Sequence, residues 1–143
     1  MNKENKSILK ELYLVRSRGI SPNLPEFARV TPTIGDNTAN GLTRAVVDFL
    51  TMSGHQAERI NTMGRIIQKG VKSTYIPTTG TKGSADISAT IKGRSVKIEI
   101  KIGKDKQSIH QIAYQEAIER AGGIYVVVKS FDQFMEWYKN LNL

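Results

Sequence analysis

The sequence contains no cysteine among its 143 residues. This absence excludes disulfide bonds, thiolate zinc sites and cysteine nucleophiles, and it is compatible with a reducing cytoplasm. No hydrophobic run approaches the about 18 apolar residues that a membrane span needs. The opening residues, MNKENKSILK, lack the apolar segment and cleavage site of a secretory signal. We therefore expect a soluble, cytoplasmic protein with no membrane partner.

Acidic residues are few relative to basic ones. The chain has 13 Asp and Glu against 21 Lys and Arg, which gives a formal net charge of +8. Such an excess attracts polyanions, most often nucleic acid. The positive charges are spread through segments that are predicted to fold, which favours a binding face over a disordered basic tail. Charge alone does not distinguish DNA from RNA.

Hydrophobic periodicity predicts one α/β domain, with a central mixed β-sheet flanked by helices. Residues 1–36 are expected to form an N-terminal helix and an extended arm, and residues 37–143 the core domain. The arm, SPNLPEFARVTPTIGDNTANG, is rich in proline, glycine and asparagine. The predicted elements are helices at 3–18, 41–53 and 108–121, a final helix after Ser130, two short strands within HQAERINTMGRIIQKG, a hairpin of 85–91 and 96–102, and a buried strand at 124–128.

The polar face of the hairpin carries the strongest chemical pattern. Directly paired residues of an antiparallel ladder share a face, so matching the apolar sides brings Asp86, Glu99 and Lys101 together. Two registers satisfy this condition, one pairing Asp86 with Glu99 and the other pairing Asp86 with Lys101. Two neighbouring carboxylates suit Mg²⁺, and a lysine beside them can orient or deprotonate a water or stabilise charge on a phosphate. The alternative is an exposed hairpin face with a Glu–Lys pair worth less than about 1 kcal/mol.

The segments around this hairpin resemble a known family. GSADI, IEIK, Gln111 and AGGIYVV occur in the order typical of the PD-(D/E)XK nuclease superfamily. The sequence is most similar to its stand-alone VRR-NUC branch, which is related to the Holliday-junction resolvases. GHQAERIN and GRSVKIEIK also fall where that family places its first strand and catalytic hairpin, and the resemblance extends from Leu42 to Val128.

The resemblance implies a restriction-endonuclease-like core, in the order αβββαβ, and a Mg²⁺-dependent DNA endonuclease. Asp86, Glu99 and the carbonyl of Ile100 would hold Mg²⁺, with Mn²⁺ able to substitute, and Lys101 would be the catalytic lysine. Gln111 matches a glutamine beside the site of that branch. The spacing Ser108-x-x-Gln111 is also that of a helix capping box, and the sequence leaves both interpretations open.

One position departs from the family pattern. The family usually has a glutamate near the start of the helix before its first strand, whereas NTANGLTRAVV offers Asn40 and no carboxylate. An amide oxygen there would bind a metal more weakly than a carboxylate. The alternative function is therefore a catalytically weak or inactive DNA-binding module on the same fold.

Several basic residues are candidates for phosphate contacts, which give affinity without sequence information. They are Arg59, Arg65, Lys69 and Lys72, together with Lys82 in the loop PTTGTKGS, and Lys104 and Lys106. One site cuts one strand per encounter, so small nucleases commonly act as two-fold dimers. The apolar stripes of helix 3–18 and of the helix with Trp137 and Tyr138 exceed what a small sheet needs. We therefore expect a homodimer on duplex or branched DNA.

Overall fold

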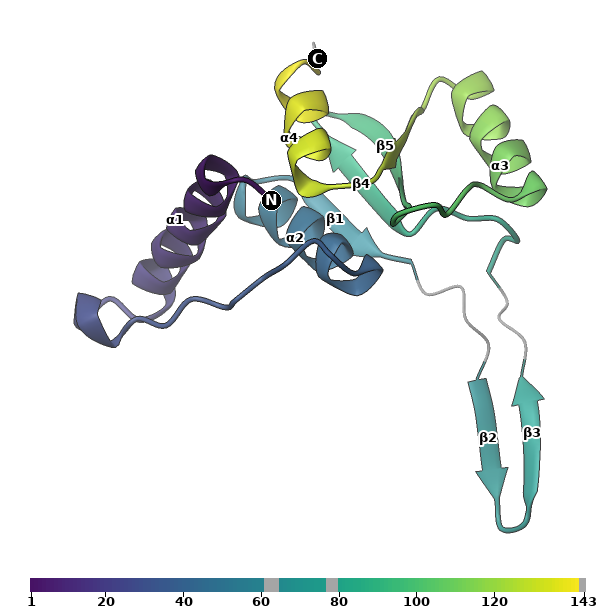
Figure 1. The fold of residues 1–143 in the computed structure, drawn as a ribbon, viewed down its shortest axis with the longest axis horizontal. Helices are drawn as coiled ribbons and strands as arrows, with labels where there is room; N and C mark the ends of the chain where they lie inside the picture. Colours follow the sequence, from purple (N-terminus) through teal and green to yellow (C-terminus); the bar gives the residue numbers. More distant parts are fainter. Residues whose placement is uncertain (61–64, 77–79, 142–143) are drawn as a thin grey trace.

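The computed structural model describes residues 1–60, 65–76 and 80–141 (Figure 1). Its helices are α1 (Lys3–Ile20), the 3₁₀ turn η1 (Glu26–Ala28), α2 (Ala39–Met52), α3 (Ile109–Arg120) and α4 (Phe131–Lys139). Its strands are β1 (Gln56–Arg59), β2 (Arg65–Lys69), β3 (Lys72–Ile76), β4 (Ile87–Ile91), β5 (Arg94–Ile100) and β6 (Ile124–Val128).

A four-stranded sheet in the order β1-β4-β5-β6 forms the centre of the molecule. β4 is antiparallel to β1 and β5, whereas β5 and β6 are parallel. Because parallel strands need a crossover connection, α3 joins β5 to β6. When the separate pair β2 and β3 is left out, the elements α2, β1, β4, β5, α3 and β6 follow in the predicted order αβββαβ. The prediction of a small α/β domain with a mixed sheet flanked by helices is confirmed.

The hydrophobic core lies between one face of this sheet and the helices α2 and α4. Alternation along β4 and β5 turns Ile87, Ile98 and Ile100 to this face, and all three are buried. α2 and α4 cover them with side chains that include Phe49 and Phe134, whose rings lie 5.7 Å apart. α3 lies over the other face of the sheet, the one that carries the polar residues of the hairpin, where Tyr114 contacts Tyr125 of β6.

The N-terminal segment joins the same core. Leu9 of α1 and Ile34 of the arm are buried in it. The carboxylate of Asp36 accepts hydrogen bonds from the Met1 ammonium and from the backbone N–H of Phe131, both at 2.9 Å. The arm is thereby fixed to the start of α4, and the division of the chain at residue 36 stays a prediction.

The hairpin of β4 and β5 has a tight turn at Lys92 and Gly93. Both have positive φ, 47° and 80°, as a two-residue type I′ turn requires. The strands are shifted relative to the predicted ranges, because residues 85, 86, 101 and 102 lie outside them. Asp86 therefore directly precedes β4, and Lys101 directly follows β5, so both candidate residues lie at the same end of the hairpin.

The segment after β1 differs most from the prediction. β3 was not expected, since the sequence predicts only one strand between β1 and the hairpin. β2 and β3 pair with each other in a separate two-stranded sheet, and Figure 1 shows this ribbon projecting from the rest of the molecule. The sequence predicted β2 without placing it in or outside the central sheet.

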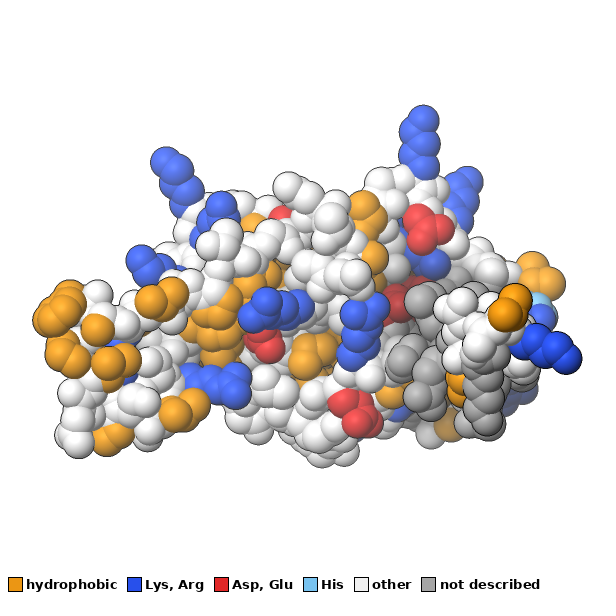
Figure 2. Space-filling view, turned by 90° about the horizontal axis from the view of Figure 1, so that it is seen from below, with side chains coloured by type: hydrophobic (Ala, Val, Ile, Leu, Met, Phe, Trp, Pro, Cys, Tyr) orange, Lys and Arg blue, Asp and Glu red, His pale blue; other side chains and the backbone are white. Residues whose placement is uncertain are grey.

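The apolar stripes that suggested a dimer are largely used within the chain. Ile8, Leu12, Trp137 and Tyr138 pack against the core. Exposed hydrophobic side chains gather instead around the end of α1 and η1, at the left of Figure 2, and Phe27 is 93% exposed. The homodimer therefore stays a prediction. No helix in the described part of the chain is long and apolar enough to cross a membrane.

Candidate functional site

The register of the hairpin brings two carboxylates to one end of the sheet. Ile87 pairs with Ile98, and Ser88 pairs with Lys97. Continuing this register by one pair sets Asp86 opposite Glu99, which selects the first of the two predicted registers. Directly opposite residues have Cβ atoms about 5 Å apart. The backbone N–H of Ile100 also donates to Asp86 Oδ2 at 2.8 Å, which holds the Asp86 side chain against β5.

Glu99 is enclosed although it lies on the polar face of the hairpin. It is 1% exposed. Its Oε1 lies 3.0 Å from Lys101 Nζ, and its Oε2 accepts a hydrogen bond from the Tyr125 hydroxyl at 3.3 Å. Lys101 is itself 7% exposed. An exposed hairpin face is therefore the wrong interpretation for these two residues, because they form a buried ion pair.

Gln111 fulfils both of the roles that its position suggested. Its Oε1 accepts the backbone N–H of Ser108 at 2.8 Å, and the capping box is complete. The same Oε1 accepts from Lys101 Nζ at 3.1 Å, while the side-chain amide donates to Glu99 Oε1. The capped end of α3 thereby fixes both members of the ion pair.

The charges at this site perturb one another. Burial raises the pKa of Glu99, the charge of Asp86 raises it further, and the hydrogen bond from Lys101 opposes both effects. Burial alone would lower the pKa of Lys101, but the carboxylates of Glu99 and Asp105 raise it above its usual value. Burial, together with the charge of Glu99, also raises the pKa of Tyr125. The lysine is therefore a fixed ammonium, which suits it to stabilise negative charge and does not suit it to remove a proton.

A groove of about 400 Å³ lies beside this ion pair, and it is lined by Lys101 but not by Glu99 or Asp86. Its lining also includes Lys82, Lys106, His110 and Gln111, together with the acidic residue Asp105. One wall is the loop before β4, which contacts the first turn of α3 through Gly83. Gly83 has φ +82°, and a Cβ built on it would lie 2.3 Å from the backbone oxygen of His110. This close approach keeps Lys82 beside the groove.

The other predicted residues are spread around the site. Arg59 and Lys104 are exposed and do not line the groove. Arg65 begins β2, and its side chain lies outside the described part of the structure. Asn40 is exposed in the first turn of α2. The described hydrogen bonds do not join it to Asp86 or to Glu99.

The site offers two carboxylates as candidate ligands for magnesium. Within residues 1–60, 65–76 and 80–141, no three or more Asp, Glu or His side chains come together as a metal site. Mg²⁺ is nevertheless often bound through one or two carboxylates and several waters. Asp86 and Glu99 provide such a pair. The carbonyl of Ile100 points to the same side of β5 as its N–H, which donates to Asp86, because both backbone groups of a strand residue face one neighbour.

Two residues that touch the ion pair were not identified from the sequence. Tyr125 binds Glu99, and Asp105 lies 3.5 Å from Lys101 Nζ. A tyrosine in a predicted buried strand needs a partner for its hydroxyl, and this requirement was an available signal. Asp105 lies in an irregular loop and is mostly exposed, so the sequence offered no comparable indication.

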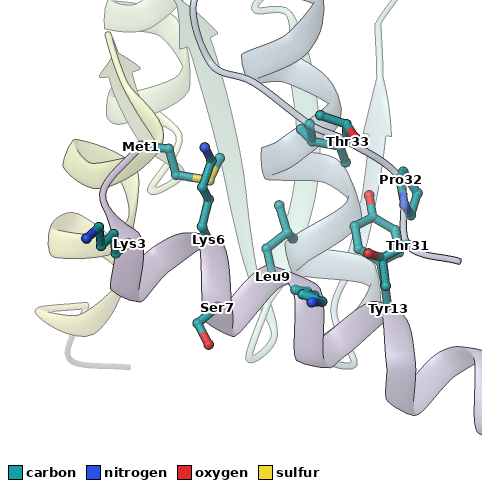
Figure 3. Close-up of a pocket in the computed structure, with 11 residues that line it drawn as sticks. Met1, Lys3, Lys6, Ser7, Leu9, Tyr13, Thr31, Pro32 and Thr33 are labelled. Atoms are coloured by element: carbon teal, nitrogen blue, oxygen red, sulfur yellow. The ribbon is translucent and has the colours of Figure 1, made fainter. Parts of the chain in front are cut away.

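A second cavity, of about 300 Å³, lies between α1 and residues 31–34 of the arm (Figure 3). Lys6 extends beside Met1, and Tyr13 approaches Pro32 across the cavity. Its lining includes lysines, threonines and apolar side chains and has no carboxylate among the described residues. It therefore lacks the acid pair of the hairpin site and is separate from it.

Comparison with protein-family models and with curated proteins returns no match for this chain.

Proposed function

We propose that the protein is a Mg²⁺-dependent DNA endonuclease with Asp86, Glu99 and Lys101 at its centre. The observation that carries this proposal is the hairpin register, which when continued by one pair sets Asp86 opposite Glu99, with a buried ammonium 3.0 Å from Glu99. The groove beside them is lined by Lys82 and Lys106. Three lysines and one aspartate line the groove, and this excess of positive charge beside the acidic groups fits the binding of a phosphodiester backbone.

Each residue of the site has a role that follows from its position. Asp86, Glu99 and the carbonyl of Ile100 would hold Mg²⁺ or Mn²⁺, which when bound supplies Lewis-acid activation of water and phosphate. Lys101 lines the groove, and its ammonium would stabilise the negative charge that develops on the phosphate. Gln111 is a positioning residue, because it bonds to both Glu99 and Lys101.

The resemblance and the charge together suggest the wider context. We expect duplex or branched DNA as the substrate, bound mainly through phosphates by Lys82 and Lys106 and by the exposed Arg59 and Lys104. A homodimer would present two sites to the two strands of a symmetric substrate. The absence of cysteine is in keeping with a cytoplasmic location.

Cleavage of supercoiled plasmid and of a four-way junction in Mg²⁺, Mn²⁺ or EDTA tests the proposal. We expect cutting that EDTA abolishes. Asp86→Asn should lose at least about a hundredfold in rate while binding DNA as well or better, because it removes a negative charge from the site. Glu116→Gln is the matched control, since it removes an exposed carboxylate of α3, and it should cut like the wild type. An Asp86→Asn protein that cuts at the wild-type rate would refute the assignment.

A non-catalytic DNA-binding module is the second candidate. It is favoured by Asn40, which stands where the family usually has a glutamate, and by the hydrogen bonds that occupy both oxygens of Glu99. DNA binding without cleavage in either metal would support this candidate. Asn40→Glu then distinguishes a weakened nuclease from a module without the site, because a gain in cleavage or metal affinity is expected only for the former.

A further inference from the structure

The ribbon of β2 and β3 has exposed side chains and a separate sheet, and both features are typical of a surface that binds another molecule. Its two five-residue strands pair with each other and with no strand of the central sheet in the described structure. An isolated two-stranded ribbon is marginally stable in water. Val71 at the turn is fully exposed, and Ile67 is 38% exposed. A molecule that binds the ribbon would therefore increase its stability.

The charge of the ribbon indicates what that molecule is. Residues 65–76 contain three basic residues, Arg65, Lys69 and Lys72, and no acidic one. The register pairs position 69 with 72 and position 65 with 76. Because positions alternate between the two faces, the backbone register assigns all three basic positions to one face, and the other face has only neutral residues. Of the three basic side chains, that of Lys72 lies within the described part of the structure. Like charges at directly paired positions destabilise a ladder, and an anion bound to that face removes this cost.

Both ends of the ribbon connect to the candidate site. Before it, β1 runs beside β4, and the N–H of Ile60 donates to the carbonyl of Asp86 at 2.7 Å. After it, the turn at residues 81–84 brings Lys82 to the groove and leads directly to Asp86. The described segments that precede and follow the ribbon in the sequence therefore both lie at the candidate site.

We propose that the cationic face of the β2–β3 ribbon binds duplex DNA in the major groove beside the candidate site. The major groove of B-form DNA admits a two-stranded ribbon, whereas that of A-form RNA is too narrow for side chains to read. Five strand residues span about 17 Å, or about five base pairs. The inference rests on the proposed function in taking nucleic acid as the partner, and it deepens that function by naming B-form duplex as the form bound.

Two double variants with the same change in net charge test the face. Lys69→Gln with Lys72→Gln removes two positive charges from the cationic face. Gln68→Glu with Ser73→Glu adds two negative charges to the opposite face, so both variants lower the net charge by two. Affinity for a 20-base-pair duplex is measured by fluorescence anisotropy in EDTA between 50 and 200 mM salt, after circular dichroism and thermal melting have shown that both variants are folded.

We expect the cationic-face variant to bind about 60-fold more weakly at 0.1 M salt, because each lost phosphate contact lowers the association constant about eightfold at that salt concentration. The slope of log K against log salt should fall by about 1.8. The opposite-face variant should stay within about threefold of the wild type, and double-stranded RNA should bind the wild type much more weakly than DNA. Equal losses in the two variants would show that net charge alone acts, and equal binding of RNA would exclude groove insertion; either result overturns the proposal.

The binding assay separates this inference from the nuclease activity. If the wild type binds duplex through the cationic face but cuts nothing in Mg²⁺, the endonuclease fails and the ribbon assignment stands. If the wild type cuts DNA and the cationic-face variant binds as tightly as the wild type, the ribbon assignment fails alone. Light scattering tests whether the ribbon instead binds a second copy of the chain. If the cationic-face variant loses self-association and keeps its DNA affinity, the ribbon is assigned to a contact between two copies of the chain.

Discussion

Replacing Lys101 with methionine tests the energetics of the candidate site most directly. The substitution keeps an apolar stem of similar length and removes the ammonium that lies 3.0 Å from Glu99 Oε1. Glu99 is 1% exposed, so it would stay enclosed without its charged partner. Breaking a buried ion pair in this way costs about 3–5 kcal/mol, because one charge remains buried and uncompensated.

The remaining contacts of Glu99 favour the lower end of that range. Gln111 and the Tyr125 hydroxyl still donate to its two oxygens. The contact of Lys101 with Asp105 adds little, since the Asp105 side chain is 61% exposed. We therefore expect Lys101→Met to lower the free energy of unfolding by about 3 kcal/mol at neutral pH.

Urea denaturation in EDTA measures this change as a shift in midpoint at constant slope. The double variant Lys101→Met with Glu99→Gln is the control, because it removes the stranded charge. It should recover at least about 1.5 kcal/mol of the loss, since replacing both partners of a buried pair is often nearly neutral. A single variant within about 0.5 kcal/mol of the wild type would refute the reasoning. So would a double variant that is less stable than the single one.

Two further predictions concern the connections around the site. Gly83→Ala should cost at least about 1 kcal/mol more than Gly93→Ala in urea denaturation: both glycines have φ near +80°, but only at Gly83 does the new Cβ meet backbone, at 2.3 Å from the His110 oxygen. Equal costs would mean that the loop is not held against α3. Asp36→Asn should cost about 1–3 kcal/mol at neutral pH, because Asp36 is 8% exposed and accepts from Phe131. Although burial opposes it, hydrogen bonding from the Met1 ammonium and the Phe131 amide lowers the pKa of Asp36, so this stability is present above the unfolded pKa and is lost as the pH falls through the folded one. The difference in the free energy of unfolding between Asp36→Asn and the wild type should therefore shrink toward pH 3. A difference that stays constant with pH would contradict this prediction.

The hairpin could be predicted from the sequence because its constraints are local. Alternation in IEIK and ISATI assigned the faces, and KGR between the two strands indicated the turn. These two conditions left two registers, which differ in whether Asp86 stands opposite Glu99 or Lys101. The choice between them depends on how the turn is built, and that is decided by the positive φ of Lys92, a residue that seldom adopts this conformation.

Burial of the site could not be predicted, because it depends on elements distant in the sequence. Glu99 is enclosed by Tyr125 from β6 and by Gln111 from α3, and neither contact follows from the pattern of the hairpin. The separate ribbon has a similar origin. KSTYI has no clean alternation of apolar and polar residues, so the sequence carries only a weak signal for this strand.

The placement of Asp86 is what distinguishes this arrangement from an ion pair that serves the fold alone. Glu99 and Lys101, with Gln111 and Tyr125, already form a satisfied buried cluster, and no described buried side-chain polar atom lacks a partner. A second carboxylate opposite Glu99 adds repulsion, which raises the pKa of Glu99 and weakens the cluster. The bond from Ile100 to Asp86 fixes the orientation of that carboxylate and leaves the repulsion in place. A cation between the two acids would remove the repulsion, and this is the physical argument on which our proposal of a metal-dependent site rests.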